Sequence, residues 1–386
     1  MIPGQVGGTE TYLRRTLAAL PALLAPDERL VVFASAENIS VLLDDLRAVG
    51  ASCRERRSAD VCEVVGTGVR AVSRVRRLAF ENFSLPRLLR LHSVSALWNP
   101  GNSAVFRAPC PQVTTVHDMQ YERFPEDFST PALFAMRALV PAAVRRSAVT
   151  IAVSEFSRGE ILRFVPGADP RRVVAVPEAA DPFFAAPPTD PEGAVAEARL
   201  LSGCSRNERF ALVVSNSYPH KSLETAVFAF SRLAQRFPDL RLVVLGRARR
   251  GEGALLSAIR ETRAGERVVR LDGGVSRERL SALYRTAELL LFPSRYEGFG
   301  LPVLEAMSAG LPVVAARAGS VPEVAGEAAL LCPPGDAAAM AGAAASILSD
   351  PALAERLRAA GRARAAAFSW ERSAAGVLAA LRQSAC

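Results

Sequence analysis

Two glutamates, Glu297 and Glu305, lie on either side of a glycine-containing loop and could together bind a ligand that carries both phosphate and hydroxyl groups. The apolar run Leu289–Phe292 before them is typical of a buried parallel strand, and Pro302 suits the first turn of a following helix. Unpaired backbone N–H groups at such a helix start bind anions. A carboxylate only accepts hydrogen bonds, so it suits hydroxyls rather than phosphate. The pattern therefore predicts a site for a ligand such as a nucleotide sugar.

These residues and several other motifs resemble one known family. Glu-x7-Glu with Gly-Phe-Gly-Leu-Pro inside it resembles the family-4 retaining glycosyltransferases, which have the GT-B fold of two facing Rossmann-like α/β domains with parallel sheets and a cleft between them. The resemblance covers nearly the whole chain and includes five further segments, at residues 116–118, 153–157, 219–221, 310–315 and 319–324. It implies transfer of a hexose from a nucleoside-diphosphate sugar to an acceptor hydroxyl of a glycan or lipid-linked glycan, with retention of anomeric configuration.

The resemblance also implies roles for the loop and its two glutamates. Glu305 is expected to bind the ribose hydroxyls of the donor, and Glu297 to face the transferred sugar. Otherwise Glu305 would form a surface salt bridge, and Glu297 would be a loop carboxylate in a mildly favourable position near a helix start. Four loop residues are expected to approach the sugar hydroxyls and phosphate through their backbone: Gly298, Phe299, Gly300 and Leu301.

Lys221 and His117 are the other two candidate catalytic residues. Lys221 is the only lysine among 47 Lys and Arg residues, and it falls where the resemblance places a diphosphate-binding lysine. It would neutralise the negative charge that grows on the leaving nucleoside diphosphate. His117 follows the predicted strand Gln112–Val116, and the family has a donor-contacting histidine in this motif, so we expect it to hydrogen bond to the sugar. A lone histidine is otherwise more often structural.

Further donor-binding positions match the family less closely. Many relatives carry an Arg five or six residues before the lysine, where this chain has Ser215 and Asn216. Asn216 could donate a hydrogen bond without charge, and Arg247 is a candidate substitute for the missing guanidinium. The resemblance places Gly274 and Val275 beside the nucleobase.

The start of the chain carries a glycine pair, Gly7-Gly8, with no strand before it. In the family a buried first strand precedes this pair. We therefore expect that the N-terminal domain lacks its first strand here, or that the natural start lies upstream. Loss of a central strand would leave two ladders of unpaired backbone groups. Gly8 is expected to approach the donor phosphates or the acceptor, and the alternative is an ordinary Gly-Gly turn.

Strands alternate with helices in two successive runs, which predicts two α/β domains. The proline-rich stretch 178–192 has the composition of a linker. We predict an N-terminal acceptor domain at 1–185, a C-terminal donor domain at 186–368 and a last helix at 369–386. In the family resembled, that helix returns to the N-terminal domain.

The net charge is +8, and the segment 54–90 holds nine arginines against four acidic residues. Part of this segment is predicted to be a helix that runs to about His92 and is broken by Pro86. The segment could meet an anionic membrane surface or an anionic lipid-linked acceptor. The alternative is an ordinary solvated surface. Nucleic acid is disfavoured because no nucleic-acid-binding module is visible.

Several absences narrow the expected function. No apolar run approaches 18 residues, no signal peptide is visible, and the six cysteines show neither metal spacing nor a pairing pattern. We therefore expect a cytoplasmic protein, peripheral at most on the inner face of the membrane. No Asp-x-Asp, dinucleotide-binding or Walker motif occurs, so we expect no metal and no cofactor besides the nucleotide-sugar co-substrate.

The donor and acceptor stay open at this point. Mannose is mildly favoured, because the chain start and the Pro-His-Lys region resemble bacterial mannosyltransferases of polysaccharide assembly. The alternatives are an inactive GT-B homologue that acts as a binding subunit, a GT-B nucleotide-sugar epimerase and a phosphorylase. An epimerase would need another set of carboxylates, and a phosphorylase would need a lysine for its pyridoxal cofactor.

Overall fold

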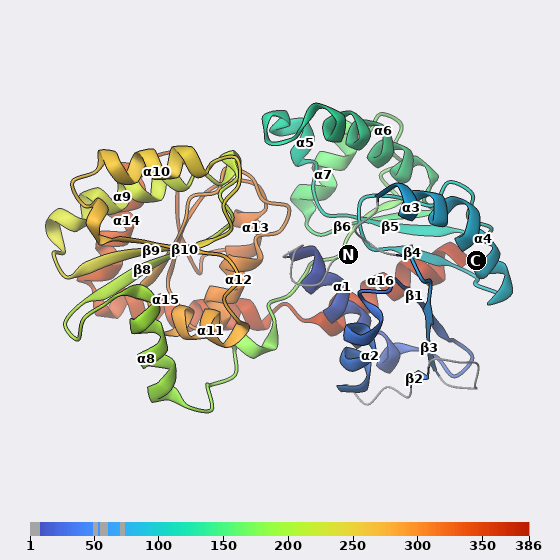
Figure 1. The fold of residues 1–386 in the computed structure, drawn as a ribbon, viewed down its shortest axis with the longest axis horizontal. Coiled ribbons are helices and arrows are strands. Elements are labelled where there is room, and N and C mark those ends of the chain that lie inside the picture. Colours follow the sequence, from blue (N-terminus) through green and yellow to red (C-terminus); the bar gives the residue numbers. More distant parts are fainter. Residues whose placement is uncertain (1–7, 49–52, 55–60, 70–73, 386) are drawn as a thin grey trace. The chain divides into compact units, whose positions relative to one another are not determined.

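The computed structural model describes four stretches of the chain (Figure 1): residues 8–48, 53–54, 61–69 and 74–385. The chain forms two units. The N-terminal unit comprises Met1–Glu122, Thr130–Ala179 and Ser369–Cys386. The C-terminal unit comprises Arg123–Ser129 and Ala180–Phe368. The main division follows Ala179, earlier than the predicted boundary after residue 185, and the last helix is part of the N-terminal unit.

The described part of the N-terminal unit contains two parallel sheets, of order β1-β3-β2 and β4-β5-β6-β7. The strands are β1 Leu30–Ala34, β2 Cys53–Arg54, β3 Cys62–Gly66, β4 Leu97–Asn99, β5 Gln112–Val116, β6 Val149–Ala152 and β7 Val173–Ala175. The helices are α1 Gly8–Ala19, η1 Pro21–Leu23, α2 Ile39–Ala48, α3 Arg74–Ala79, η2 Phe80–Ser84, α4 Leu85–Leu91, α5 Gln120–Arg123, α6 Thr130–Arg146, α7 Glu155–Phe164 and α16 Trp370–Ala385. The prediction about a strand before Gly8 falls on residues 1–7, outside the described residues.

The C-terminal unit is built on one parallel sheet of order β10-β9-β8-β11-β12-β13. The strands are β8 Arg209–Val214, β9 Leu240–Gly246, β10 Val268–Asp272, β11 Leu289–Phe292, β12 Val313–Ala316 and β13 Leu330–Cys332. The helices are η3 Pro125–Asp127, η4 Pro182–Phe184, α8 Pro191–Ser202, η5 Pro219–Lys221, α9 Leu223–Arg236, α10 Glu252–Glu261, η6 Gly265–Arg267, α11 Arg277–Thr286, α12 Leu301–Ser308, α13 Val321–Ala325, α14 Ala337–Ser349 and α15 Pro351–Ala366.

The C-terminal sheet reverses its direction of growth between β8 and β11, its two central strands. The chain first adds β9 and β10 on one side of β8, and then returns to add β11, β12 and β13 on the other side. In open parallel sheets, ligands bind outside the carboxyl ends of the strands at such a switch point. The loops after Val214 and Phe292 therefore occupy the expected ligand position in this unit.

The apolar run Leu289–Phe292, predicted to be a buried strand, is confirmed as β11, and its four side chains are at most 1% exposed. Helices lie on both faces of this sheet in Figure 1, so a central strand is apolar throughout rather than alternating. Helix α9 presents one apolar face to the same core. That face consists of Leu223, Ala226, Val227, Phe230, Leu233 and Ala234. Dense packing on both faces fixes where β11 ends, and so fixes the start of the loop that follows.

The predicted break in the arginine-rich helix is present, but it begins before Pro86. Helix α3 runs into a π-helical stretch, η2, which then leads into α4 with Pro86 in its first turn. Proline has no N–H to donate, and its ring crowds the carbonyl of the preceding turn. A wider π-helical stretch relieves that crowding while the chain continues in a helical direction.

Helix α16 packs on the four-stranded sheet of the N-terminal unit. Its Val377 and Ala380 contact a cluster that includes Val113, Val149 and Ile151. Gly376 allows close contact, because a Cβ atom there would lie 2.7 Å from a methyl group of Val176. No single helix in the described part of the chain is long and apolar enough to cross a membrane, although one bent pair, Ala337–Ser349 with Pro351–Ala385, meets the length and composition requirement.

Candidate functional site

Lys221 and Glu297 are brought together at the switch point of the C-terminal sheet. Their Nζ and Oε1 atoms lie 2.6 Å apart, and the side chains are 18% and 10% exposed. Lys221 ends the short helix η5, which follows β8, whereas Glu297 lies in the loop after β11. The two loops are tied directly, since the N–H of Arg295 donates to the carbonyl of His220 over 2.8 Å. The predicted catalytic lysine and carboxylate of this unit therefore form one ion pair.

The loop after Glu297 is held from behind by Gly319 and Ser320. The buried Ser320 hydroxyl lies 2.7 Å from the Phe299 carbonyl and 3.2 Å from the Glu297 carbonyl, and its own N–H donates to Glu297 O. Gly319 has φ +60°, and a Cβ atom there would lie 2.6 Å from Glu297 N. Only glycine permits both the backbone conformation and this approach. The motif 319–324 marked this region, but its pattern predicted no role for these two residues.

Helix α12 begins at Leu301, directly after Gly300, whose φ is +97°. Pro302 occupies the first turn, as predicted. Pro302 has no N–H, and the N–H of Val303 donates to the carbonyl of Gly300 over 3.0 Å. Anion binding by the backbone at this helix start stays a prediction. Phe299 and Leu301 are buried. Any contact that they make with a ligand is therefore expected to come from their backbone groups.

Glu305 lies on α12 and accepts a hydrogen bond from Tyr284, with 3.0 Å between the phenolic oxygen and Oε2. Burial, and then the nearby Glu305 charge, raise the pKa of Tyr284 well above its ordinary value, so the phenol stays protonated and keeps donating. No pattern in the sequence predicted a role for Tyr284, because a tyrosine in helix α11 carries no motif of its own. Its hydroxyl fixes one carboxylate oxygen of the residue predicted to bind ribose.

The remaining predicted donor residues of this unit lie at the carboxyl ends of β8, β9 and β10. Asn216 accepts a hydrogen bond from the backbone N–H of Arg247 over 2.9 Å, through its side-chain oxygen. Gly246 has φ +151°, and a Cβ atom there would lie 1.9 Å from the Ser215 carbonyl. A Cβ atom on Gly273 would lie 2.8 Å from Arg247 N. The loop that contains Asn216 and the loop that contains Gly273 therefore both pack against the backbone of residues 246–247.

His117, in the N-terminal unit, makes two polar contacts through its ring. Nδ1 lies 3.3 Å from Glu178 Oε1, and Nε2 lies 2.9 Å from the carbonyl oxygen of Pro100. The ring of Tyr12 meets it edge-on at 5.0 Å between centroids. A carbonyl and a carboxylate only accept hydrogen bonds, so both nitrogens can donate when the ring is protonated. A hydrogen bond from His117 to a sugar would therefore have to replace one of these contacts.

Gly8 is the first residue of α1 and is exposed, whereas Gly7 lies outside the described residues. Of the nine arginines in segment 54–90, the structure describes the side chains of four: Arg76, Arg77, Arg87 and Arg90. Arg77 pairs with Glu81 over 3.4 Å, while Arg76, Arg87 and Arg90 are exposed.

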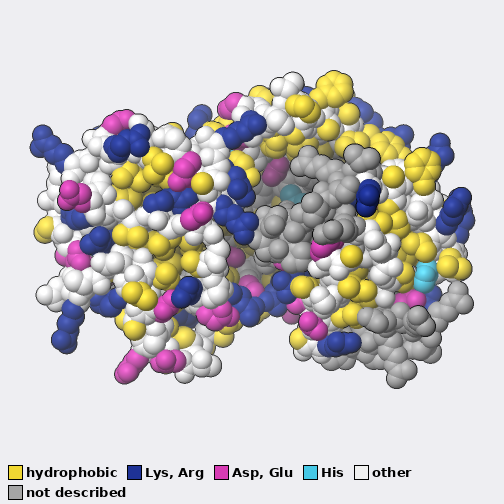
Figure 2. Space-filling view, in the orientation of Figure 1, with side chains coloured by type: hydrophobic (Ala, Val, Ile, Leu, Met, Phe, Trp, Pro, Cys, Tyr) yellow, Lys and Arg dark blue, Asp and Glu magenta, His cyan; other side chains and the backbone are white. Residues whose placement is uncertain are grey.

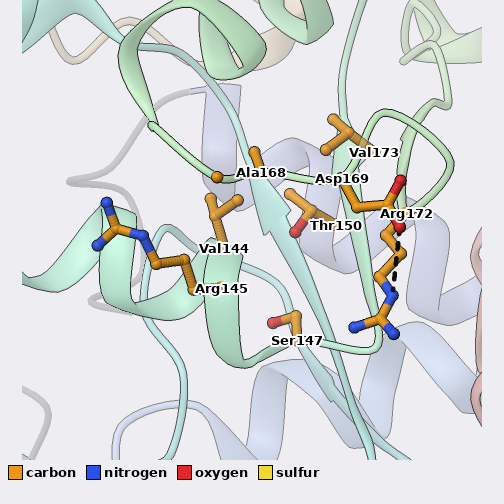
Figure 3. Close-up of a pocket in the computed structure, with 9 residues that line it drawn as sticks. Val144, Arg145, Ser147, Thr150, Ala168, Asp169, Arg172 and Val173 are labelled. Atoms are coloured by element: carbon orange, nitrogen blue, oxygen red, sulfur yellow. Dashed lines mark ion pairs between the residues drawn. The ribbon is translucent and has the colours of Figure 1, made fainter.

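A small hollow in the N-terminal unit lies apart from the predicted residues. Its wall includes Arg145, Arg172, Ser147 and Thr150 (Figure 3). Arg172 pairs with Asp169 over 3.9 Å, and Arg145 donates to the carbonyl of Pro166 over 3.1 Å. Figure 3 shows the Arg145 guanidinium directed away from the Arg172 side chain. Both cations are already engaged, so we assign this hollow no role.

A doubly wound parallel sheet with a helix start at its switch point is the architecture of nucleotide-binding α/β proteins. Comparison with known families narrows this class. Residues 202–364 match the family model "Glycosyl transferases group 1", and residues 6–182 match "Glycosyltransferase Family 4". The O-antigen chain mannosyltransferase B of Escherichia coli is 30% identical over 259 residues, which are 67% of either chain. The chain therefore belongs to the glycosyltransferases described by these two family models.

Further relatives and solved structures agree with this assignment. A D-inositol 3-phosphate glycosyltransferase of Kineococcus radiotolerans is 32% identical over 253 residues, which are 61% of this chain and 57% of that protein. The crystal structure of Anabaena HepE in complex with UDP and glucose has a TM-score of 0.73 at 20% identity, and covers 99% of this chain and 98% of that one. WaaG, a glycosyltransferase involved in lipopolysaccharide biosynthesis, has a TM-score of 0.69 at 15% identity, with 97% and 96% covered. The predicted GT-B fold is thereby confirmed.

The environment of His117 generates a pH-dependent prediction. Burial lowers the pKa of His117, but hydrogen bonding and charge from Glu178, helped by the Pro100 carbonyl and Asp118, raise it above its ordinary value overall. The protonated ring therefore stabilises the fold fully below the unfolded pKa of about 6.5, and this contribution is lost as pH rises through the folded pKa. Glu178→Gln should lower the pKa of His117 and reduce stability most below pH about 6.5.

The measurement is an NMR titration of the three histidine rings, combined with melting curves across the same pH range. Glu63→Gln is the matched control, because Glu63 lies 3.3 Å from a different histidine, His92. That variant should leave the His117 titration unchanged. A wild-type His117 that titrates at or below about 6.5 would contradict the prediction.

Proposed function

We propose that this glycosyltransferase moves a hexose, with mannose favoured, from a nucleoside-diphosphate sugar to a hydroxyl of a glycan or lipid-linked glycan, with retention of anomeric configuration. The observation that carries the proposal is the Lys221–Glu297 pair beside the N-terminus of α12. This arrangement offers cationic and dipolar groups to a diphosphate, and carboxylates to hydroxyls.

In the proposed reaction, the glycosidic bond breaks and negative charge grows on the departing diphosphate. Lys221 would leave Glu297 for the diphosphate, and the N–H groups at the start of α12 would bind its oxygens. Glu297 would then be available to the hydroxyls of the transferred sugar. Because these groups supply positive charge where it is needed, we propose that neither a metal ion nor another cofactor takes part.

Two sets of relatives support different donors. The Escherichia coli relative is an O-antigen chain mannosyltransferase, and an α-(1→4)-mannosyltransferase of Mycolicibacterium hassiacum is 35% identical over 176 residues. These favour mannose as the transferred sugar. The structural relative from Anabaena is a complex with UDP and glucose. The donor base is therefore the first property to measure.

Donor binding can be tested by thermal shift with UDP, GDP and ADP on the wild type and Glu305→Ala. At least one nucleotide should raise the melting temperature, since a ligand at 100 times its Kd stabilises by about 2.7 kcal/mol. Glu305→Ala should weaken binding, because a carboxylate can accept two charge-assisted hydrogen bonds from ribose worth roughly 1.5–3 kcal/mol each.

Two further variants sharpen this test. Tyr284→Phe removes only the hydroxyl that orients Glu305, so its loss of binding should be smaller. Glu261→Ala, on an exposed part of α10, should bind like the wild type. Unchanged affinity in Glu305→Ala would refute the ribose assignment. Donor consumption then separates the alternatives, because a binding subunit would consume none, and an epimerase would convert the donor without an acceptor.

Lys221 can be tested by two substitutions with different physical effects. Lys221→Arg keeps the charge, but the planar guanidinium is bulkier than an ammonium, so turnover should fall at least about tenfold, equivalent to roughly 1.4 kcal/mol. Lys221→Ala should lose about 10²–10³-fold, as for other removed transition-state donors. The measurement is the initial rate at saturating donor. Near-normal rates in both variants would remove Lys221 from the reaction.

Melting curves of the two variants report on the ion pair itself. Lys221→Ala leaves the mostly buried Glu297 carboxylate without its cation, so its melting temperature should fall. Lys221→Arg retains a cation and should melt closer to the wild type. A rate loss in Lys221→Arg without a matching stability loss would separate the role in catalysis from the role in folding.

We also propose that the N-terminal unit docks on an anionic membrane, so that the enzyme works as a peripheral protein on the cytoplasmic face. Figure 2 shows hydrophobic side chains beside basic ones over α3, α4 and α6. Phe83 and Leu91 are 67% and 61% exposed, and Arg87 and Arg90 lie between them in sequence. Phe106 joins this surface, since its N–H donates to Asn82 and Arg146 covers its ring. Exposed aromatic and basic side chains together favour an anionic lipid surface.

Co-sedimentation with vesicles tests the membrane proposal. The wild type should bind vesicles that contain phosphatidylglycerol, and binding should weaken as salt rises. Phe83→Ser should reduce binding, whereas Leu200→Ser, at a 75% exposed leucine of the C-terminal unit, should not. Equal binding to neutral vesicles, or no binding to either kind, would leave an ordinary solvated surface.

A further inference from the structure

A short segment, Arg123–Ser129, belongs to the C-terminal unit although the residues on both sides of it belong to the N-terminal unit. We call it the docked segment. Its helix η3 ends at Asp127, whose Oδ2 lies 2.5 Å from Nδ1 of His220. The two side chains are 1% and 3% exposed. Breaking a buried charge-assisted hydrogen bond leaves polar groups without partners in a dry environment, so this pair fastens the segment strongly.

Aromatic and backbone contacts complete the attachment of the docked segment. The ring of Phe124 lies 5.9 Å from the rings of both His220 and Tyr296, between centroids. The guanidinium of Arg295 covers Phe124 at 5.5 Å, and Arg250 donates to the carbonyl of Glu126 over 3.2 Å. The segment is therefore attached to both loops that form the candidate site, the one after β8 and the one after β11.

His220 also connects this attachment to the residues of the proposed reaction. It directly precedes Lys221 in helix η5, and its carbonyl accepts the N–H of Arg295 over 2.8 Å. Arg295 lies two residues before Glu297. On its other side, His220 stacks with Tyr218, with 5.8 Å between ring centroids and 22° between planes. The orientation of His220 therefore sets the backbone positions from which Lys221 and Glu297 extend.

We propose that Asp127 and His220 are positioning residues of this glycosyltransferase, which hold the docked segment on the C-terminal unit and thereby fix the turn that presents Lys221 to Glu297. The inference rests on the proposed role of Lys221 in turnover. It also gives the docked segment a function, since this segment follows His117 in the chain and begins at the last residue of α5. A change in the chain near His117 would then reach the lysine through a few covalently connected residues.

Kinetics of Asp127→Ala and Asp127→Asn test the positioning role. Asp127→Ala removes the partner of His220, so kcat should fall at least about tenfold, because displacement of a charged group by about 1 Å costs this much or more. The Kd for the nucleoside monophosphate should stay within about twofold, because this ligand lacks the second phosphate of the leaving group, and Glu305 and the 298–301 loop are untouched. Asp127→Asn keeps an oxygen acceptor for Nδ1–H, so it should restore kcat to within about threefold of wild type.

Hydrogen–deuterium exchange gives a readout that needs neither donor nor acceptor. In Asp127→Ala, exchange should become faster in peptides that cover 124–128 and at the N–H of Arg295, which the His220 carbonyl protects in the wild type. Glu63→Ala is the matched control, because it breaks another histidine–carboxylate pair, the partly buried His92–Glu63, in the N-terminal unit. That variant should change neither peptide and should leave kcat near wild type.

The outcomes separate this inference from the proposed function. Faster exchange at Arg295 with a fall in kcat and an unchanged Kd supports positioning. Normal kcat in Asp127→Ala, or equal losses in Asp127→Ala and Asp127→Asn, overturns it. If Asp127→Ala does not fold, exchange in Asp127→Asn decides: protection at Arg295 supports the pair, and its loss overturns it. If the wild type consumes no GDP-, UDP- or ADP-hexose, the proposed function fails, while exchange still decides whether the pair fixes the turn.

Discussion

The candidate site depends on one constraint: β8 and β11 are neighbours in a parallel sheet. In the chain, 74 residues lie between the end of β8 at Val214 and the start of β11 at Leu289. Neighbouring parallel strands end at the same edge, so the loops that follow them must emerge together. Lys221 comes from one loop and Glu297 from the other, and their 2.6 Å contact exists only because of this strand order. The strand order brings the two loops together, and the other contacts of the site fix the exact positions of their residues.

The positions of the loop residues are fixed largely by close packing of backbone against backbone. Gly319 lies against Glu297, and Gly246 lies against Ser215, each closer than any side chain with a Cβ atom would allow. Ser320 then fastens the loop after Glu297, because its hydroxyl donates to the carbonyls of Phe299 and Glu297. These contacts hold the loops rigid through their backbone. Such rigidity is what an anion-binding loop requires, because its N–H groups must keep their direction when a charged ligand arrives.

Sequence reasoning predicted those parts of the fold and site that depend on local pattern. The strand Leu289–Phe292, the helix start at Pro302 and the break near Pro86 follow from hydrophobicity and from proline chemistry, and the structure has all three. Tyr284 and Ser320 were missed because their roles exist only through partners on other elements. The Asp127–His220 pair could not be predicted either, because its two residues are 93 positions apart and meet only in the folded chain.

Tertiary contacts change the chemical role expected of His117, although its place in the fold was predicted correctly. Its place at the end of β5 was predicted, but its partners Glu178 and Pro100 lie 61 and 17 residues away. Both contacts favour a protonated ring, and a protonated ring can only donate hydrogen bonds. A sugar hydroxyl that approached this histidine would therefore act as an acceptor. If His117 does contact the donor, we expect its ring to donate a hydrogen bond that orients a sugar oxygen, since its present partners favour the protonated form.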